Sequence, residues 1–292
     1  MKEWIFTGVC TALVTPFGRD GVDIPALRRL IRRQLNAGVP ALLACGTTGE
    51  ASTLTEDEWE QTLRCTVSMA HGRAAILAGT GTNDLRRTLE RARLARALGA
   101  DAQLVVTPYY NQTTQAGLID YFTRVAEGSE LPVIVYNVPG RTGLNLLPET
   151  AARLAEHPQI MGIKEAAGDL NQLADMVLGC RVPVYCGTDR LNAAALRLGA
   201  AGMISVLSNL LPEEEQRVYT DMAEGRAQAA FARQQALQPV IRALFAETSP
   251  APVKAALALL GLCADTVRSP LVPVQPDTLE ALRSCLLQEV TG

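Results

Sequence analysis

The residue with the clearest chemical potential in this sequence is Lys164, because lysine is nearly absent elsewhere. Of the 27 lysine and arginine residues, only Lys2, Lys164 and Lys254 are lysines. A guanidinium stays protonated and is not a nucleophile, whereas a desolvated amine can lose its proton and attack a carbonyl. Lys164 ends the apolar run 159–164, where an unpaired lysine is costly unless it is used. A genomic preference for arginine explains the scarcity of lysine but not this position.

Hydroxyl and phenol side chains stand at or just after the ends of other apolar runs. These residues are Thr47, Thr48, Tyr109, Tyr110 and Tyr136. An amine with phenols nearby suits imine chemistry, which needs repeated proton transfers at one carbon and one nitrogen. The loop 46–50 also offers backbone N–H groups and two hydroxyls that suit a small carboxylate, although an ordinary turn explains it equally well.

The elements that position these residues alternate along the chain. Eight short runs are continuously apolar, as is typical of parallel strands that are covered on both faces. The runs are 9–14, 40–45, 74–79, 102–106, 132–136, 159–163, 183–186 and 202–206. Helical patterns fill the gaps, among them 24–35, 56–69, 83–98 and 147–156. This alternation predicts an α/β fold, a (β/α)8 TIM barrel over residues 1–224, with its active site at the carboxyl ends of the strands.

The strand pattern stops after residue 224. Residues 225–246, 252–262 and 277–289 have helical patterns and are separated by proline-containing stretches. We therefore expect a C-terminal helical domain of residues 225–292, packed as an appendix on a catalytic barrel of residues 1–224.

Composition and residue counts exclude several classes of function. The net charge of −3 and the pI near 5.6 argue against nucleic acid or an anionic membrane as a partner, and no apolar run has the length of a membrane span. The two histidines, His71 and His157, precede predicted strands, so a Ser-His-Asp triad and a His-ligated metal site lack parts. No glycine-rich nucleotide loop is present, so we expect neither a metal nor a cofactor. Seven scattered cysteines and the absence of a signal-like N-terminus predict a cytoplasmic protein.

Four segments resemble the signature motifs of the dihydrodipicolinate synthase family. They are Gly-Thr-Thr-Gly-Glu at 46–50, Val-Thr-Pro-Tyr-Tyr-Asn at 106–111, Tyr-Asn-Val-Pro-Gly-Arg-Thr-Gly at 136–143 and Gly-Ile-Lys-Glu at 162–165. This family belongs to the pyruvate-dependent class I aldolases, which also contain N-acetylneuraminate lyase. The resemblance runs in order through the whole chain, and it implies condensation of pyruvate with aspartate 4-semialdehyde to 4-hydroxy-tetrahydrodipicolinate.

The resemblance implies four catalytic residues. Lys164 forms the Schiff base with pyruvate, and Tyr136 moves protons during formation of the imine and the enamine. Thr47 links Tyr136 to Tyr110, which in the family reaches across from a neighbouring subunit. From this likeness we expect a homotetramer, a dimer of dimers.

The substrate-binding residues follow in the same way. Thr48 and the loop amides hold the carboxylate of pyruvate, Arg141 holds the carboxylate of the second substrate, and Gly187 and Ile204 complete the site. Arg141 is also the choice that separates synthases from neuraminate lyases.

Several positions depart from the family pattern and keep other functions open. Ala167, Thr188 and Ser249 stand where synthases usually carry threonine, aspartate and asparagine. The alternatives are a related aldolase that acts on a 2-keto-3-deoxy sugar acid or another aldehyde, and a non-catalytic paralogue that binds a keto acid.

The resemblance also bears on regulation. Lysine-inhibited synthases use a glutamate at the position of Arg87 and histidines at the positions of Glu56 and Trp59, while Asn83 and Tyr109 are retained here. An arginine facing an ammonium group replaces attraction with repulsion. We therefore predict that this protein is insensitive to L-lysine.

Overall fold

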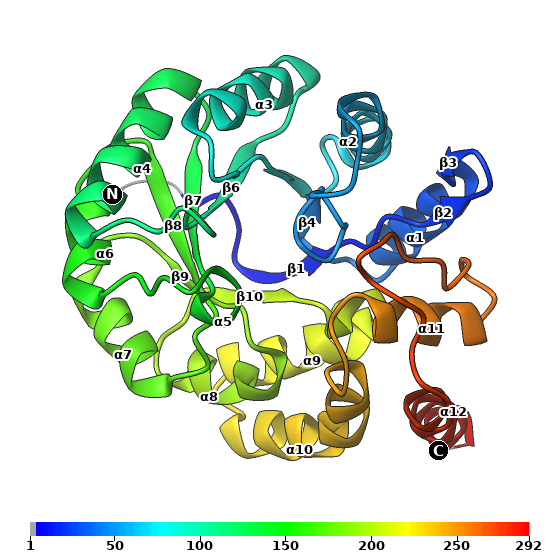
Figure 1. Cartoon of the computed structure of the whole chain (residues 1–292). Helices are drawn as coiled ribbons and strands as arrows, with labels where there is room; N and C mark the ends of the chain where they lie inside the picture. The colour runs from blue at the N-terminus through cyan, green and yellow to red at the C-terminus, as the bar shows by residue number, and fades with distance from the viewer. Residues whose placement is uncertain (1–3, 292) are drawn as a thin grey trace.

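Eight parallel strands close into a barrel, with their connecting helices in a ring around it (Figure 1). The computed structural model describes residues 4–291, with the backbone alone for residues 287–291. The order around the barrel is β1-β10-β9-β8-β7-β6-β5-β4, and β2 and β3 form a separate hairpin. The strands are β1 Gly8–Ala12, β2 Phe17–Gly18, β3 Gly21–Val22, β4 Ala41–Ala44, β5 Ala75–Gly79, β6 Ala102–Val106, β7 Val133–Asn137, β8 Ile160–Glu165, β9 Val184–Cys186 and β10 Gly202–Ser205. The predicted (β/α)8 barrel is thus confirmed.

The outer helices begin where the sequence supplies capping side chains. The helices are α1 Ile24–Asn36, α2 Glu56–Ala70, α3 Leu85–Leu98, α4 Gln115–Ser129, α5 Pro139–Thr142, α6 Pro148–Leu154, α7 Leu170–Gly179, α8 Asn192–Arg197 and α9 Pro212–Ala223, with 3-10 turns η1 Asp189–Leu191 and η2 Leu207–Asn209. Thr55 and Glu58 form a reciprocal capping box on α2. The side chain of Asp84 accepts a bond from Arg86 N, so α3 begins at Leu85 and not at residue 83 as the pattern predicted.

The barrel has an apolar layer on each side of its wall. Inside it, side chains such as Cys10, Leu43, Leu77 and Ile134 are buried in one cluster, while the larger cluster lies between strands and helices. Burial on both faces is why the strands are continuously apolar. The first and last strands meet closely at Gly202, where a Cβ atom would lie 2.1 Å from the carbonyl oxygen of Gly8. Only glycine allows the barrel to close in this way.

Three further helices follow the barrel and lie on one side of it (Figure 1). They are α10 Ala227–Leu244, α11 Ala251–Leu259 and α12 Pro276–Thr291. Helix α10 packs on α8 and α9, and α11 packs on η2 and α12. The predicted C-terminal helical appendix is confirmed, while its treatment as a separate domain from residue 225 onward stays a prediction.

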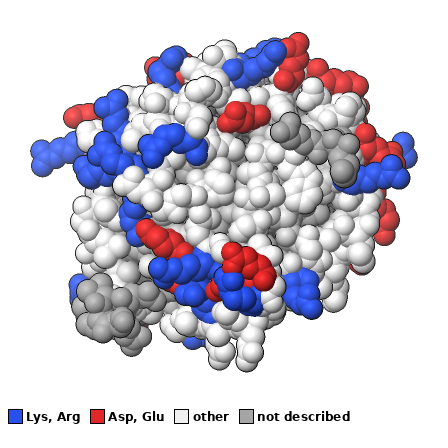
Figure 2. Space-filling view, turned by 180° about the vertical axis from the view of Figure 1, so that it is seen from behind, with Lys and Arg blue, Asp and Glu red and all other residues white. Residues whose placement is uncertain are grey.

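Charges are distributed in small mixed groups over the face shown in Figure 2. Basic and acidic side chains lie interspersed there around a broad uncharged middle. Within residues 4–291, no helix combines the length and the apolar character needed to cross a membrane.

Candidate active site

A cavity of about 450 Å³ opens at the carboxyl ends of the barrel strands. Six of the eight residues that the sequence assigned to the site line it: Thr47, Thr48, Tyr136, Arg141, Lys164 and Gly187. The strand ends bring them together because parallel strands present their carboxyl ends at one face of a barrel. The cavity is thus where the sequence predicted an active site.

Lys164 and Tyr136 are neighbours on adjacent strands. They are paired in register between β7 and β8, and both are 6% exposed. The Nζ atom of Lys164 lies 4.2 Å from the centre of the Tyr136 ring. The amine is therefore held against an aromatic ring at the wall of the cavity, with a phenol on the neighbouring strand.

Gly187 provides the space that the lysine side chain occupies. A Cβ atom on Gly187 would lie 2.8 Å from Cε of Lys164 and 2.8 Å from Cβ of Ala166. Any larger residue there would displace Lys164 or its strand, so glycine at 187 has a steric reason.

Glu165 fixes the strand end that carries Lys164. Its buried carboxylate accepts hydrogen bonds from Asn137 Nδ2 at 2.8 Å, Gln172 Nε2 at 3.1 Å and the backbone N–H of Ala167 at 2.5 Å. Burial raises the pKa of Glu165, and these three donors oppose that shift. The network joins β7, β8 and α7 directly behind the lysine.

The loop after β4 carries Thr47 and Thr48 as a tight turn. Glu50 N donates to Thr47 O at 3.0 Å, and Gly49 N donates to Gly46 O at 3.1 Å. Thr48 is 6% exposed and lines the cavity beside Thr47. The loop therefore presents two hydroxyl-bearing residues to the same space as Lys164.

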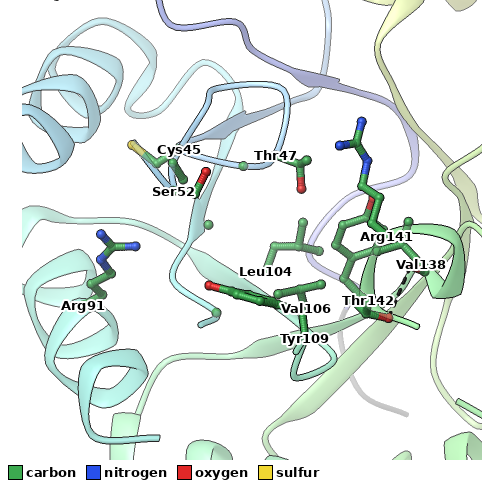
Figure 3. A pocket seen from close by; sticks show the side chains of 15 residues that line it. Cys45, Thr47, Ser52, Arg91, Leu104, Val106, Tyr109, Val138, Arg141 and Thr142 are labelled. Carbon is green, nitrogen blue, oxygen red and sulfur yellow. Dashed lines mark hydrogen bonds between the residues drawn. The ribbon is translucent and has the colours of Figure 1, made fainter. Parts of the chain in front are cut away.

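A second cavity of about 190 Å³ adjoins the first through Thr47, Tyr136 and Arg141. Figure 3 shows Arg141 and Arg91 on opposite sides of it, with Tyr109 between them. Tyr109 lies here, although the sequence assigned a catalytic role to its neighbour Tyr110.

Arg141 reaches the larger cavity from α5, the short helix after β7. Its Nη2 atom donates to the carbonyl oxygen of Ser249 at 3.1 Å, and Ser249 lines the same cavity. A cationic fork is therefore placed at the mouth, where a substrate carboxylate can reach it.

Two of the assigned residues lie outside both cavities. Tyr110 is 94% exposed, with a left-handed backbone at φ 69°. Ile204 is 1% exposed and packs inside the barrel with Leu43 and Tyr136. Within this single chain, Tyr110 does not meet Thr47 in a cavity, and Ile204 contributes to the packing beneath the site.

Sequence reasoning missed the residues that come from the C-terminal helices. Helix α10 contributes three residues to the larger cavity, Gln238, Ile241 and Arg242, and Phe245 directly after the helix is a fourth. No local motif marks them, because the face that α10 turns to the barrel depends on how the helix packs.

A buried acid also lines the cavity. Asp189 lines the cavity, is 2% exposed and accepts hydrogen bonds from Val206 N at 3.0 Å and Leu207 N at 2.8 Å. Burial raises the pKa of Asp189, and the Leu207 N–H and the charge of Lys164 oppose that shift. Burial, with the charge of Asp189 in addition, raises the pKa of the fully buried Glu215 well above its usual value.

Other reactive groups near the barrel axis are held in unreactive form. Burial raises the pKa values of Cys10 and Cys45, and it raises that of Cys186 to about 12. These thiols stay neutral and are poor nucleophiles. Among residues 4–286, no group of three or more His, Cys, Asp and Glu side chains is arranged to hold a metal ion.

The fold and cavity define a (β/α)8 barrel with a buried lysine at the end of its β8 strand. Comparison with known protein families matches residues 5–289 to the Dihydrodipicolinate synthetase family. The chain belongs to this family.

Individual relatives match nearly the full length. A 4-hydroxy-tetrahydrodipicolinate synthase from Thermoanaerobacter sp. is 42% identical over 97% of this chain and 96% of its own. The crystal structure of dihydrodipicolinate synthase from Thermotoga maritima has a TM-score of 0.96 and 41% identity, covering 98% of this chain and 99% of its own. That of the chloride-inhibited synthase from Acinetobacter baumannii, complexed with pyruvate, has a TM-score of 0.94 and 41% identity, covering 96% and 98%.

Proposed function

We propose that this chain is a 4-hydroxy-tetrahydrodipicolinate synthase, which condenses pyruvate with aspartate 4-semialdehyde through a Schiff base on Lys164. The observation that carries the proposal is the buried Lys164 amine, which faces a cavity beside the Tyr136 ring in a chain of this family. Similarity to an enzyme whose structure contains pyruvate supports the same substrate here.

The covalent step follows from the chemistry of an amine and a ketone. The neutral Nζ of Lys164 attacks the keto carbon of pyruvate. A proton delivered to the carbinolamine hydroxyl lets it leave as water, and a protonated imine remains. Removal of a proton from the methyl group then gives an enamine, whose carbon attacks the aldehyde while the aldehyde oxygen takes up a proton. The amino group of the aldehyde substrate then attacks the imine carbon, which closes the ring and releases the amine of Lys164. Tyr136 lines the same cavity as the amine, with its ring 4.2 Å from Nζ, and is the proposed proton carrier; Thr47 also lines the cavity.

Substrate binding is assigned to the other cavity residues. Thr48 and the N–H groups of its loop are proposed to hold the pyruvate carboxylate, and Arg141 the carboxylate of the aldehyde substrate. Gly187 leaves room for the lysine side chain, and Ile204 supports the floor beneath it.

A second reaction, cleavage or formation of a 2-keto-3-deoxy sugar acid, shares the pyruvate half of this mechanism. Thr188 lines the cavity and offers a neutral hydroxyl where the acceptor would bind. A panel of aldehydes, assayed with pyruvate, separates the two: the synthase accepts aspartate 4-semialdehyde with the highest kcat/KM.

The quaternary structure is part of the proposal. Tyr110 is 94% exposed in the single chain and is available to a second copy. We propose a cytoplasmic homotetramer in which Tyr110 of one subunit completes the relay of Thr47 and Tyr136 in its neighbour. Analytical ultracentrifugation tests the assembly, and a monomer with full activity would contradict the role of Tyr110.

Borohydride reduction in the presence of pyruvate tests the covalent step. We expect one stable adduct per chain, located at Lys164 by peptide mass spectrometry. Lys254 is an internal control, because it is equally a buried lysine but lies outside the cavity. Folded protein without an adduct, or with an adduct on Lys254, would overturn the proposal.

A further inference from the structure

The loop that presents Thr47 and Thr48 is anchored from behind by a fully buried ion pair. Lys254 on α11 is 0% exposed, and its Nζ donates to Glu50 Oε1 at 2.7 Å. Glu50 ends the loop, is 4% exposed and has a left-handed backbone at φ 53°. The pair joins residues that are 204 positions apart in the sequence.

All hydrogen-bonding groups of this pair have partners. The Nζ of Lys254 also donates to the carbonyl oxygen of Thr15 at 2.9 Å and lies 4.1 Å from the centre of the Phe17 ring. The second carboxylate oxygen of Glu50 accepts from the backbone N–H of Arg268 at 2.9 Å. A buried ion pair with every group satisfied fixes its geometry strongly, because each alternative position leaves a charge unpaired.

Thr15 links the ion pair to the backbone of the loop at Gly49. Thr15 Oγ1 donates to the carbonyl oxygen of Gly49 at 2.8 Å, so the segment after β1 contacts the loop through Thr15 and through Lys254. The loop is therefore held at Gly49 and Glu50, immediately after the two threonines that line the cavity.

We propose that Lys254 and Glu50 are positioning residues that hold Thr47 and Thr48 in register with Lys164, so that the C-terminal helix α11 sets the affinity of the site for the carboxylate of pyruvate. This inference rests on the proposed function for the identity of the ligand. Neither residue lines the cavity, so they act through the loop and not on the substrate.

Arg141, the proposed ligand of the second substrate, also contacts the C-terminal segment. Arg141 donates to Ser249 O, five positions before Lys254 in the sequence. The two attachments differ, because Arg141 contacts the segment with its own guanidinium, whereas the loop of Thr47 and Thr48 is held through Glu50. Loss of the ion pair therefore affects the pyruvate side of the cavity and leaves the contact of Arg141 in place.

Steady-state kinetics of Lys254→Met test the proposal. We expect KM for pyruvate to rise about ten-fold or more, while kcat and KM for the aldehyde change less than about three-fold. The threonine loop that binds the pyruvate carboxylate would be displaced, whereas Lys164 and Tyr136 would stay in place. Thr15→Val, which keeps the side-chain shape and loses only the bond to Gly49 O, should raise the same KM by a smaller factor. It supplies the test if Lys254→Met does not fold.

Arg233→Met is the matched control. Arg233 pairs with Glu214 and Asp221 between α9 and α10 and has no contact with the loop. Its loss should leave KM for pyruvate unchanged. An unchanged KM for pyruvate in folded Lys254→Met or Thr15→Val would overturn the proposal. So would a fall in kcat and a rise in KM for the aldehyde as large as the rise in KM for pyruvate.

Hydrogen exchange separates this inference from the proposed function. The amides of Gly49 and Glu50 are bonded within the loop turn, and their exchange should accelerate in Lys254→Met and not in Arg233→Met. That result stands whether or not the wild-type protein forms an adduct with pyruvate. Unchanged exchange in the folded variant would contradict the anchoring role of the ion pair.

Discussion

Both lysines within residues 4–291 are buried, and their surroundings differ. Lys164 lies at the wall of a cavity, with the Tyr136 ring 4.2 Å from its Nζ. Lys254 is enclosed between the barrel and α11, with Glu50, a backbone carbonyl and the Phe17 ring around its ammonium. Burial lowers the pKa of Lys254, and the charge of Glu50 opposes that shift. A lysine with an acid partner stays charged and structural, whereas one that faces a cavity is available for chemistry.

The largest expected effect comes from removing the amine at the cavity. Lys164→Met should lower turnover by at least ~10⁴-fold, because no other amine is found among the described residues that line the cavity. It should leave the free energy of unfolding unchanged or slightly raised, since a thioether fills the volume without a polar group to satisfy. Chemical denaturation beside a turnover assay measures both.

Replacing the paired lysine, Lys254, should instead lower the free energy of unfolding and leave turnover nearly unchanged. Lys254→Met leaves the carboxylate of Glu50 without its ionic partner, and breaking a buried pair costs about 3–5 kcal/mol of stability. If Lys164→Met destabilised the fold as much as Lys254→Met, the distinction between the two lysines would be wrong.

The next effect concerns the phenol beside the cavity lysine. Tyr136→Phe keeps the ring against Nζ and removes the hydroxyl, so kcat should fall ~10²–10⁴-fold as for the loss of a general acid–base group. The pyruvate concentration that gives half-maximal borohydride trapping should change much less, because the carboxylate site is intact. A change confined to KM, with normal turnover, would contradict the proton-carrier role.

The sequence was sufficient for the barrel and for six of the eight residues that it assigned to the cavity. Strand runs and helices were predicted within a few residues, because burial on both faces leaves a continuous apolar signal. The predicted strand had Lys164 at its tip, whereas β8 continues to Glu165. An apolar pattern does not extend to Glu165, although this residue pairs with β7 and β9.

The rest of the site depends on contacts between distant segments. The sequence singled out Lys164 as costly in an apolar run, yet Lys254 is the more deeply buried of the two, and its partner Glu50 lies in a motif that was interpreted for its threonines. The contribution of α10 to the cavity, through Arg242 for example, was equally hidden. Such pairings depend on the tertiary fold and not on local spacing.

A buried acid without an ion-pair partner provides a further test of the contrast between paired and unpaired buried charges. Glu215 on α9 is fully buried; Asn192 Nδ2 donates to its Oε2 at 2.7 Å, while Oε1 has no hydrogen-bond partner. The groups that face it from η1, β9 and β10 are Asp189, Cys186 and Ser205. Burial and the charge of Asp189 raise the pKa of Glu215, while the contacts with Asn192 and Ser205 oppose that shift, so the carboxyl group is expected to keep its proton.

The sign of its effect on stability follows from the raised pKa. Glu215 in the unfolded chain titrates near 4.5, and the folded chain keeps the proton to higher pH. The folded state therefore binds more protons above pH 4.5, and stability is lost as the pH rises from there toward the folded pKa. Glu215→Gln removes this loss. The free energy of unfolding of the variant, relative to wild type, should therefore increase with pH by at most about 1.4 kcal/mol per pH unit.

Denaturant titrations at several pH values measure this difference. Glu213→Gln, at an exposed position of the same helix, is the control and should show no such trend. A constant difference between Glu215→Gln and wild type at all pH values would mean that Glu215 is ionised in the folded chain.

The smallest expected effect is that of L-lysine. Arg87 Nη2 and Arg91 Nη2 lie 2.5 Å and 3.0 Å from the same oxygen of Glu56, so one carboxylate serves two guanidinium groups. This cluster between α2 and α3 has an excess of positive charge, and it contains two of the positions that the family resemblance assigns to the lysine site, Glu56 and Arg87. Arg91 extends from it to the cavity that contains Tyr109 (Figure 3).

A bound lysine would bring its own ammonium to this excess charge. At ~4 Å each like-charge contact costs about 1 kcal/mol in water and more where it is partly buried, so we expect neither sub-millimolar binding nor inhibition. Arg87→Glu reverses one charge and should increase any residual affinity, whereas Arg86→Glu, on the same helix but without a bond to Glu56, should not. Calorimetric titration with a parallel activity assay decides the point. Tight binding of lysine to the wild-type chain, accompanied by inhibition, would place the effector site elsewhere and would remove Arg87 from the account of regulation.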